Sequence, residues 1–277
     1  MDDAVVTGLL VVWLVCWGVL LHSAEPEVSF RRLDRFVERC RLGISEQNGP
    51  VVVRYLTTAR RWRTAGAVAG LAVGLGRGLP TGTPSVDTAW ILAGWFVGAA
   101  LAEWRVTGPS AERARAALVA RERRRYAAGW VSALPLVLAV AAVVTAVLDV
   151  IAWGRLGGQA LVPCASLAVV SVATVVLVRT AVGRALARRQ PGGLAPDVLA
   201  ADEAVRHRSV HVLHGTGTAL VGIALGSLLR LHPDVPGLVA DLVTLGAALL
   251  GWGIGLRSVP LEFAEEPYAR ARAEAAA

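Results

Sequence analysis

Lysine is missing from this sequence, and all 28 of its basic residues are arginines. Cysteine is scarce, since Cys16, Cys40 and Cys164 are the only three in 277 residues. They form no CxxC pair and no Cys/His spacing typical of metal ligands, so neither a disulfide framework nor a zinc site is predicted. We interpret all three cysteines as small apolar residues.

Common catalytic motifs are also lacking. The sequence has no GxxxxGK[ST], GxGxxG, HExxH or GxSxG pattern, so we predict no nucleotide-driven motor, no catalytic residue, no metal and no cofactor. One EExxxR match, from Glu265 to Arg270, resembles the motif of CAAX-type membrane proteases. It lies in a polar tail after the last histidine, His232, and therefore predicts no protease. An enzyme whose site is assembled from separate helices stays open as an alternative.

Apolar runs of membrane-spanning length are abundant. The chain is 55% hydrophobic with a mean hydropathy of +0.55, whereas soluble chains contain about 45–50% apolar residues. Runs of about 17–24 residues suffice to cross a hydrocarbon core of about 30 Å. We predict an all-α polytopic bundle with about seven spans, namely Ala4–His22, Thr64–Leu79, Thr88–Trp104, Gly129–Ala152, Gln159–Val178, Gly215–Leu231 and Pro236–Leu256.

The distribution of arginine predicts the orientation of these spans. With Met1 outside, 25 arginines fall in cytoplasmic segments, and only Arg77, Arg155 and Arg230 fall outside. Such an excess marks the cytoplasmic side of a plasma membrane. The predicted organisation is an anchor span over 1–22, an arginine-rich cytoplasmic segment over 23–63, three helical hairpins over 64–256, and a cytoplasmic tail over 257–277.

This topology also explains the net charge of +7, so no nucleic-acid partner is predicted. In the first cytoplasmic segment, apolar residues recur at helical spacing with arginines between them; they are Phe30, Leu33, Phe36, Val37 and Cys40. This pattern predicts an amphipathic helix. It either lies on the inner leaflet, where its arginines meet anionic headgroups of the bilayer, or packs on the cytoplasmic ends of the spans.

Glycine recurs every fourth residue in the second span, at Gly66, Gly70, Gly74 and Gly78. This spacing places all four glycines on one helix face, where a second backbone can approach closely. We predict that the face is buried against another helix. The partner helix belongs either to the same bundle or to a second copy in a homo-oligomer, and a different membrane protein is a further possible partner.

Ionisable residues inside spans are candidates for function. Asp149 and Asp241 lie in apolar spans near the outer side, and Arg77 and Arg230 lie at a similar depth. We interpret these four as a charge layer in which Asp241 pairs with Arg230 and Asp149 with Arg77. The alternative is that one aspartate is unpaired and binds a proton or cation during transport.

Two other polar groups are interpreted as peripheral. Glu103 and Arg179 are expected to lie at helix ends at the inner side, where they can snorkel to the surface. Glu203 and three histidines, His207, His211 and His214, share one helix face, a spacing that can chelate a metal. The neighbouring arginines disfavour a cation there, so we expect a solvated or headgroup-facing surface and no tight metal binding.

The stretch Asp202-Glu203-Ala204-Val205-Arg206, followed by Ser209 and an apolar span, resembles uncharacterised multi-pass membrane proteins of high-GC actinobacteria. This resemblance covers about thirty residues. It implies no activity.

Three functions are compatible with the sequence. The leading hypothesis is a non-enzymatic, transporter-associated or scaffold component that contacts a cytosolic partner through its arginine-rich inner face. The second is a transporter of small solutes or ions that uses Asp149 and Asp241, and the third is a membrane-embedded enzyme acting on lipid. The lining of any internal cavity would discriminate between the three hypotheses.

Overall fold

The computed structural model describes residues 29–78, 87–106, 123–154, 161–188, 195–232 and 234–257, and within these ranges all regular structure is α-helical. The helices are α2 (Phe30–Cys40), α3 (Gly49–Gly78), α4 (Thr88–Val106), α5 (Arg123–Tyr126), α6 (Gly129–Gly154), α7 (Leu161–Ala187), α8 (Pro196–Leu231) and α9 (Gly237–Gly255). The predicted span Ala4–His22 and the predicted tail after residue 257 lie outside the described residues.

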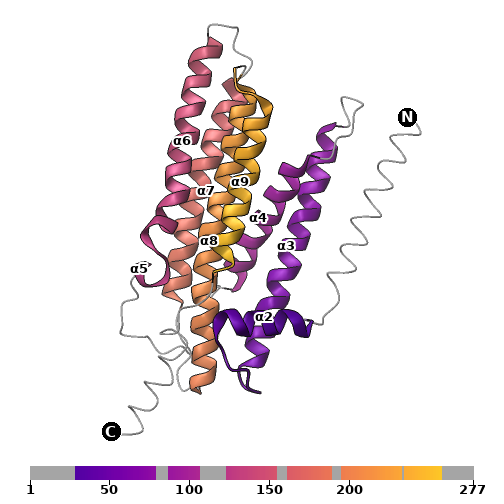
Figure 1. Ribbon diagram of the computed structural model, residues 1–277, viewed down its shortest axis with the longest axis vertical. Coiled ribbons are helices and arrows are strands. Elements are labelled where there is room, and N and C mark those ends of the chain that lie inside the picture. Colours follow the sequence, from indigo (N-terminus) through magenta and orange to yellow (C-terminus); the bar gives the residue numbers. More distant parts are fainter. Residues whose placement is uncertain are drawn as a thin grey trace, which may run out of the picture.

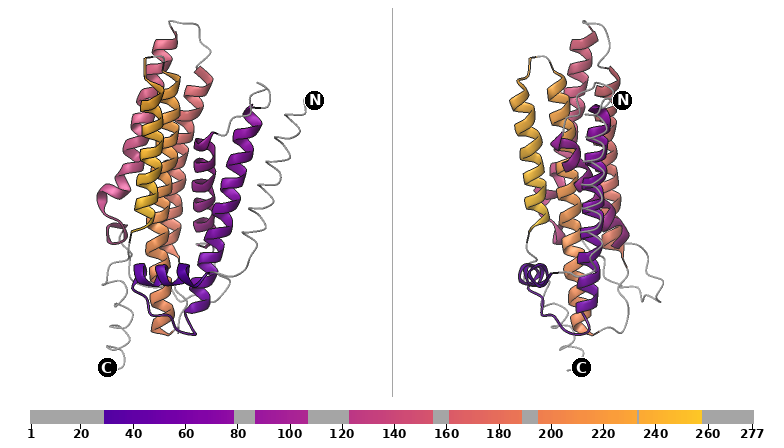
Figure 2. Two further views of the ribbon diagram at one scale, coloured as in Figure 1. Left: turned by 45° about the vertical axis from the view of Figure 1, so that its right-hand side comes forward. Right: turned by 90° about the vertical axis from the view of Figure 1, so that its right-hand side faces the viewer.

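The long helices pack in consecutive pairs, α3 with α4, α6 with α7 and α8 with α9. Helices α6 to α9 form one bundle, and the α3–α4 pair contacts this bundle mainly through α8 (Figure 1). The short helix α2 lies crosswise at one end of the long helices (Figure 2). We call this the α2 end, and we call the opposite end, where α3 and α8 terminate, the far end.

Helix α8 is the central element of the fold. Pro196 occupies its first turn, where a proline costs no helical hydrogen bond. At 36 residues, α8 is about 54 Å long. It contacts α4, α6, α7 and α9, so most of its side chains are buried on every side. The polar segment beginning at Pro196 and the predicted span Gly215–Leu231 are therefore one continuous helix.

Four helices, α6, α7, α8 and α9, are long and apolar enough to cross a membrane. Large apolar side chains on α6, α7 and α9 point outward, including Val137, Val140, Val169, Leu242 and Leu249. Such a surface is unfavourable in water, but it suits the hydrocarbon of a bilayer. The chain is therefore an α-helical membrane protein. Helices α3 and α4, which contain most of the predicted spans Thr64–Leu79 and Thr88–Trp104, run alongside these four (Figure 1).

Glycines determine the close approach of α3 and α4. A Cβ atom at Gly66 would overlap the carbonyl oxygen of Gly94, and one at Gly70 would overlap the carbonyl oxygen of Trp90. Gly74 lies farther along the same contact, where a Cβ would be 3.4 Å from the Cβ of Trp90. The glycine face of α3 is thus in backbone contact with a helix of the same chain. Gly78 is the last residue of α3.

Helix α2 packs on the ends of the long helices through Phe36 and Cys40, which are 3% and 1% exposed. Arg41 adopts a left-handed conformation that ends the helix. The loop that follows is organised by Asn48, which is fully buried. Its side chain accepts a hydrogen bond from the backbone of Ser45 at 2.9 Å and donates one to the carbonyl of Gly43 at 2.7 Å.

Candidate functional site: an arginine cleft at the α2 end

The main candidate site is a cleft of about 520 Å³ between α2, α3 and α8. We call it the arginine cleft, because six arginines line it, namely Arg32, Arg35, Arg39, Arg60, Arg63 and Arg208. Its other lining residues are apolar or aromatic, apart from the hydroxyl of Thr64. All of them belong to the described residues, and none is acidic.

Helical spacing gathers these arginines. Arg32, Arg35 and Arg39 recur at steps of three and four, which places them on one face of α2 together with Phe36. Arg60 and Arg63 follow the same rule on α3. The amphipathic helix predicted over residues 30–40 therefore has two faces that contact different parts of the protein. Its buried apolar residues hold α2 in place, and its arginines line the cleft.

Two cleft arginines lie against aromatic rings. The guanidinium carbon of Arg63 is 5.2 Å from the centre of the Trp95 ring, and that of Arg208 is 5.6 Å from the centre of the Phe36 ring. Contacts of this kind hold a cation by about 0.5–1 kcal/mol at exposed sites. The Nε of Arg63 is buried and has no hydrogen-bond partner among the described residues. These ring contacts orient both guanidiniums at the cleft.

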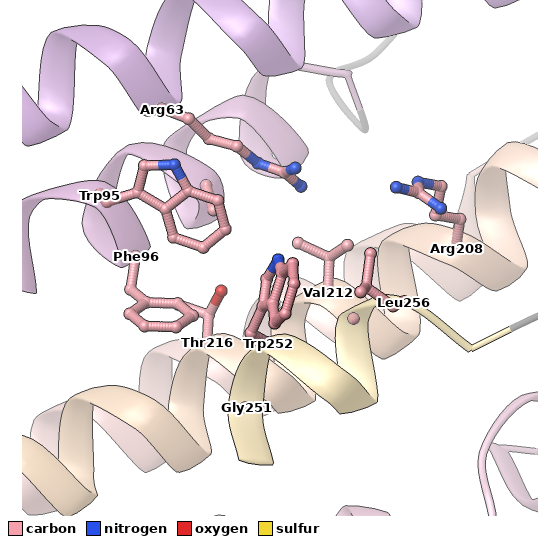
Figure 3. A pocket seen from close by; sticks show the side chains of 11 residues that line it. Arg63, Trp95, Phe96, Arg208, Val212, Thr216, Gly251, Trp252 and Leu256 are labelled. Atoms are coloured by element: carbon pink, nitrogen blue, oxygen red, sulfur yellow. The ribbon is translucent and has the colours of Figure 1, made fainter. Parts of the chain in front are cut away.

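A second hollow continues from the cleft (Figure 3). We call it the aromatic crevice, because Trp95 and Phe96 of α4 and Trp252 of α9 line it. Arg63 and Arg208 belong to both hollows, and their guanidiniums extend toward each other at the border (Figure 3). Trp95 and Trp252 also line both hollows, so guanidiniums and aromatic rings lie together along the whole site.

Behind this site, Glu103 of α4 is fully buried. It accepts a hydrogen bond from the hydroxyl of Tyr55 on α3 at 2.9 Å and one from Ser209 on α8 at 2.5 Å. The expectation that Glu103 snorkels at a helix end is therefore wrong, because α3 and α8 cover it and supply two donors. Burial, and secondarily the Glu103 charge, raise the pKa of Tyr55. Arg179 is exposed.

Arg206 connects α7 to α8. Its guanidinium donates to the carbonyls of Ala185 at 3.0 Å and Arg188 at 2.8 Å, at the end of α7. The last carbonyls of a helix lack intrahelical partners and carry partial negative charge, so a cation suits them. Asp202 forms an ion pair with the same guanidinium at 2.7 Å, and Glu203 lies 3.5 Å from its Nε. The segment that carried the actinobacterial resemblance is thus a buried structural network.

The three histidines of α8 are also buried. His207, His211 and His214 are 2%, 5% and 6% exposed, and the rings of His207 and His211 stack with centroids 4.5 Å apart. The expected solvated or headgroup-facing surface is therefore wrong. The spacing of the three histidines places them on a face of α8 that neighbouring helices cover, so these helices shield them from solvent. Within the described ranges, no group of three or more His, Cys, Asp or Glu side chains has the geometry of a metal site.

The four outer residues lie at the far end, and only two of them pair with each other. Arg230 pairs with Asp241, and both side chains are more than half exposed. Arg77 instead lies over the ring of Trp90, with its guanidinium carbon 5.3 Å from the ring centre. The expected pairing of Asp149 with Arg77 is thus absent among the contacts of the described residues.

Asp149 is fully buried at the far end. Its nearest ionisable neighbour in the described structure is His232, at 3.9 Å from Nε2 to Oδ1, and the thiol of Cys164 lies 4.0 Å from its other oxygen. Sequence inspection missed His232 as a partner. Its position just after the last residue of α8 could have indicated it, since α8 and α6 both end at this side.

No family model, no curated protein and no solved structure matches the chain. The resemblance to actinobacterial membrane proteins accordingly stays a prediction. The site offers guanidiniums and aromatic rings but no nucleophile–base pair among its lining residues.

Proposed function

We propose that this protein is a non-enzymatic component of the cytoplasmic membrane that binds phosphate-bearing anions through the arginine cleft. The observation that carries the proposal is the convergence of six arginines, with no acidic lining residue, on one cleft. Guanidinium groups match phosphate oxygens geometrically and can donate two parallel hydrogen bonds to them. This role is a specific form of the scaffold or transporter-associated hypothesis, in which the inner face is the binding surface.

The orientation we propose places the cleft in the cytosol. Seven spans with the N-terminus outside put the α2 end inside, and this is the end where nearly all arginines of the described helices lie. Arg77 and Arg230 lie at the far end. The positive-inside rule supports this choice of orientation. Placed at the inner surface, the cleft meets both cytosolic anions and anionic headgroups.

The electrostatics of the empty cleft favour an anionic ligand. Like charges that face one cleft repel each other, and salt screens this repulsion where they are exposed. Six guanidiniums around one cleft therefore destabilise the unliganded state, and a bound phosphate group would remove part of that repulsion. Binding should accordingly stabilise the fold.

The two alternative functions have less support. A transporter that uses Asp149 and Asp241 requires a polar path beside them, but neither residue lines the cleft or the crevice. Asp241 is engaged by Arg230. An enzyme acting on lipid requires histidines or paired carboxylates facing a cavity, and the lining of both hollows contains neither.

The proposal is tested by thermal unfolding of the protein purified in a neutral detergent. Inorganic pyrophosphate is titrated against sodium chloride at matched ionic strength. A ligand at 100 times its dissociation constant stabilises the fold by about 2.7 kcal/mol. We expect saturable stabilisation of the parent and none of the double variant Arg63→Gln/Arg208→Gln.

A matched control removes two arginines from the same surface outside the cleft. Arg31 and Arg61 are exposed on α2 and α3 and do not line it. The double variant Arg31→Gln/Arg61→Gln loses the same net charge and should retain the response to pyrophosphate. Equal responses of both double variants would mean that pyrophosphate acts through net charge alone, which would overturn the proposal.

A further inference from the structure

We infer that Asp149 and His232 form a proton-binding site at the far end of the molecule, where the two side chains together hold one proton at neutral pH. The site lies at the opposite end of the long helices from the arginine cleft. The inference therefore goes beyond the proposed function, and neither depends on the other.

Asp149 is enclosed by apolar groups of three helices. Its side chain is fully buried. The apolar cluster that reaches it through Cys164 of α7 also contains Ala146 of α6 and Leu228 of α8. A carboxylate in such surroundings is costly unless a cation pairs with it or a proton neutralises it. The burial of Asp149 thus calls for a neutralising partner.

The other charged side chains described at the far end do not supply that partner. They are Arg77, Asp87, Arg230, Asp234 and Asp241. Arg230 pairs with Asp241, and Arg77 lies over an aromatic ring of α4. The two remaining groups are acidic. The neutralising charge must therefore come from His232 or from a proton on the carboxyl group.

A carboxyl oxygen and a ring nitrogen face each other across the site. Oδ1 of Asp149 is buried and has no hydrogen-bond partner among the described residues, and Nε2 of His232 lies 3.9 Å from it. This distance exceeds the roughly 2.7–3.2 Å of an N–H···O hydrogen bond. The other oxygen of Asp149 faces the thiol of Cys164 at 4.0 Å, which is a weak donor. The carboxyl group thus has an open position for a proton.

The hydrogen bonds of the His232 ring define where a proton can go. Its Nδ1 accepts a hydrogen bond from the backbone N–H of Asp234 at 3.3 Å. In the neutral ring, the hydrogen is therefore on Nε2, on the side of Asp149. An added proton binds either to the carboxyl group or to Nδ1, where it displaces the bond from Asp234. Both arrangements make the pair neutral overall, so the proton belongs to the pair.

His232 also gives the site access to solvent. Its side chain is 27% exposed, whereas that of Asp149 is fully buried. In the proposed orientation, protons therefore exchange with the outer medium through the ring. Neither residue lines the arginine cleft or the aromatic crevice. The site is thus open to one side of the membrane, and it binds a proton that holds the turn after α8 against α6.

Proton binding at this pair makes the stability of the fold depend on pH. Above about pH 6.5, the usual pKa of histidine, neither residue holds a proton in the unfolded chain, whereas the folded pair holds one. Stability therefore falls as the pH rises above about 6.5, by up to about tenfold in the unfolding equilibrium constant per pH unit, until the folded pair has lost its proton. Between about pH 5 and 6.5, both states hold about one proton, and the contribution of the pair is level.

The experiment measures chemical unfolding in neutral detergent across this pH range. Asp149→Asn keeps the shape of a neutral carboxyl group but has no proton to release. Its stability should stay level where that of the parent falls, so the parent should lose at least about tenfold relative to the variant between about pH 6.5 and 8.5. Asp241→Asn is the matched control, because it removes an exposed aspartate at the same end. Its curve should run parallel to that of the parent.

His232→Gln is a second variant, and its partly exposed position makes it compatible with folding. The unfolded variant no longer takes up a histidine proton, while folded Asp149 still has to be neutralised. Stability should therefore begin to fall near about pH 5 instead of about pH 6.5. If Asp149→Asn fails to fold, this shift decides the question. Curves of the foldable variants that run parallel to the parent would show that Asp149 is ionised and would overturn the inference, while the response of the cleft to pyrophosphate would be unaffected.

Discussion

The two ends of the molecule hold their charged residues in different ways. At the α2 end, Glu103 and Arg206 are buried; Glu103 contacts residues of α3 and α8, and Arg206 contacts carbonyls at the end of α7. At the far end, Arg230 and Asp241 pair with each other in exposed positions. Apart from Asp149, which is buried at the far end, charged side chains are therefore part of helix packing at the α2 end and peripheral to it at the far end. Arginine abundance at the α2 end serves packing as well as the cleft, so arginine count alone is a poor guide to binding residues.

The comparison predicts that Arg206→Gln is the most damaging of the charge removals. The substitution leaves Asp202 and Glu203 without their main counter-ion and removes the donors that satisfy the end of α7. Breaking a buried ion pair on one side costs about 3–5 kcal/mol. Chemical unfolding in mixed micelles would measure this loss of stability. A loss below 1 kcal/mol would mean that the network is hydrated and contributes little to packing.

The glycine contact between α3 and α4 lies along the two helices and offers a test that involves no charge. Gly70→Leu should destabilise the protein by about 1–3 kcal/mol, because overpacking forces the two backbones apart. Gly76 lies on the same helix with open space around it, so Gly76→Leu is the control. Equal melting temperatures of the two variants would show that the α3–α4 contact is loose in detergent.

Tyr55 tests the buried hydrogen bonds of the α2 end. Tyr55→Phe removes a donor from buried Glu103, and an unsatisfied buried group costs about 1–3 kcal/mol. The control is Thr58→Val, because the Thr58 hydroxyl only donates to its own helix at an exposed position. Thermal unfolding of both variants at neutral pH would measure the difference. Similar losses in both would contradict the assigned role of Tyr55.

Tyr55 also predicts a dependence on pH. Its pKa is raised in the folded protein, from a usual value of 10.0, chiefly because it is buried. Its contribution to stability is therefore complete below pH 10. It falls above that pH, where only the unfolded chain ionises at this position. When the pH is raised from about 10 to about 11, Tyr55→Phe should lose less stability than the parent.

Sequence patterns predicted the all-helical membrane fold and the four helices that are long and apolar enough to cross a membrane, because spanning length and hydropathy are local properties. They failed at Glu103 and at the histidines of α8, since whether a polar helix face meets water or other helices depends on long-range packing. The arginine cleft was predictable in part. The periodicity of residues 30–40 indicated an amphipathic helix with arginines between its apolar positions, but residues on α3 and α8 that complete the cleft are distant in sequence. Likewise, His232 was missed as the neighbour of Asp149, although its position just after α8 places it at the same end of the bundle.

The smallest expected effect is at the far end, where Arg230→Gln and Asp241→Asn should each change stability by about 0–1 kcal/mol, because both side chains are exposed. A double-mutant cycle sharpens the comparison further. Because the two residues contact each other, the double variant should recover part of the loss of either single variant. The Asp149 and Arg77 cycle should show no coupling, since Arg77 lies over Trp90 instead. Unfolding of each variant at low and high salt measures both cycles, and salt should weaken the Arg230–Asp241 coupling while leaving the cost of Arg206→Gln nearly unchanged. If Arg230→Gln proved as damaging as Arg206→Gln, charge would contribute to packing at both ends, and the contrast between them would be wrong.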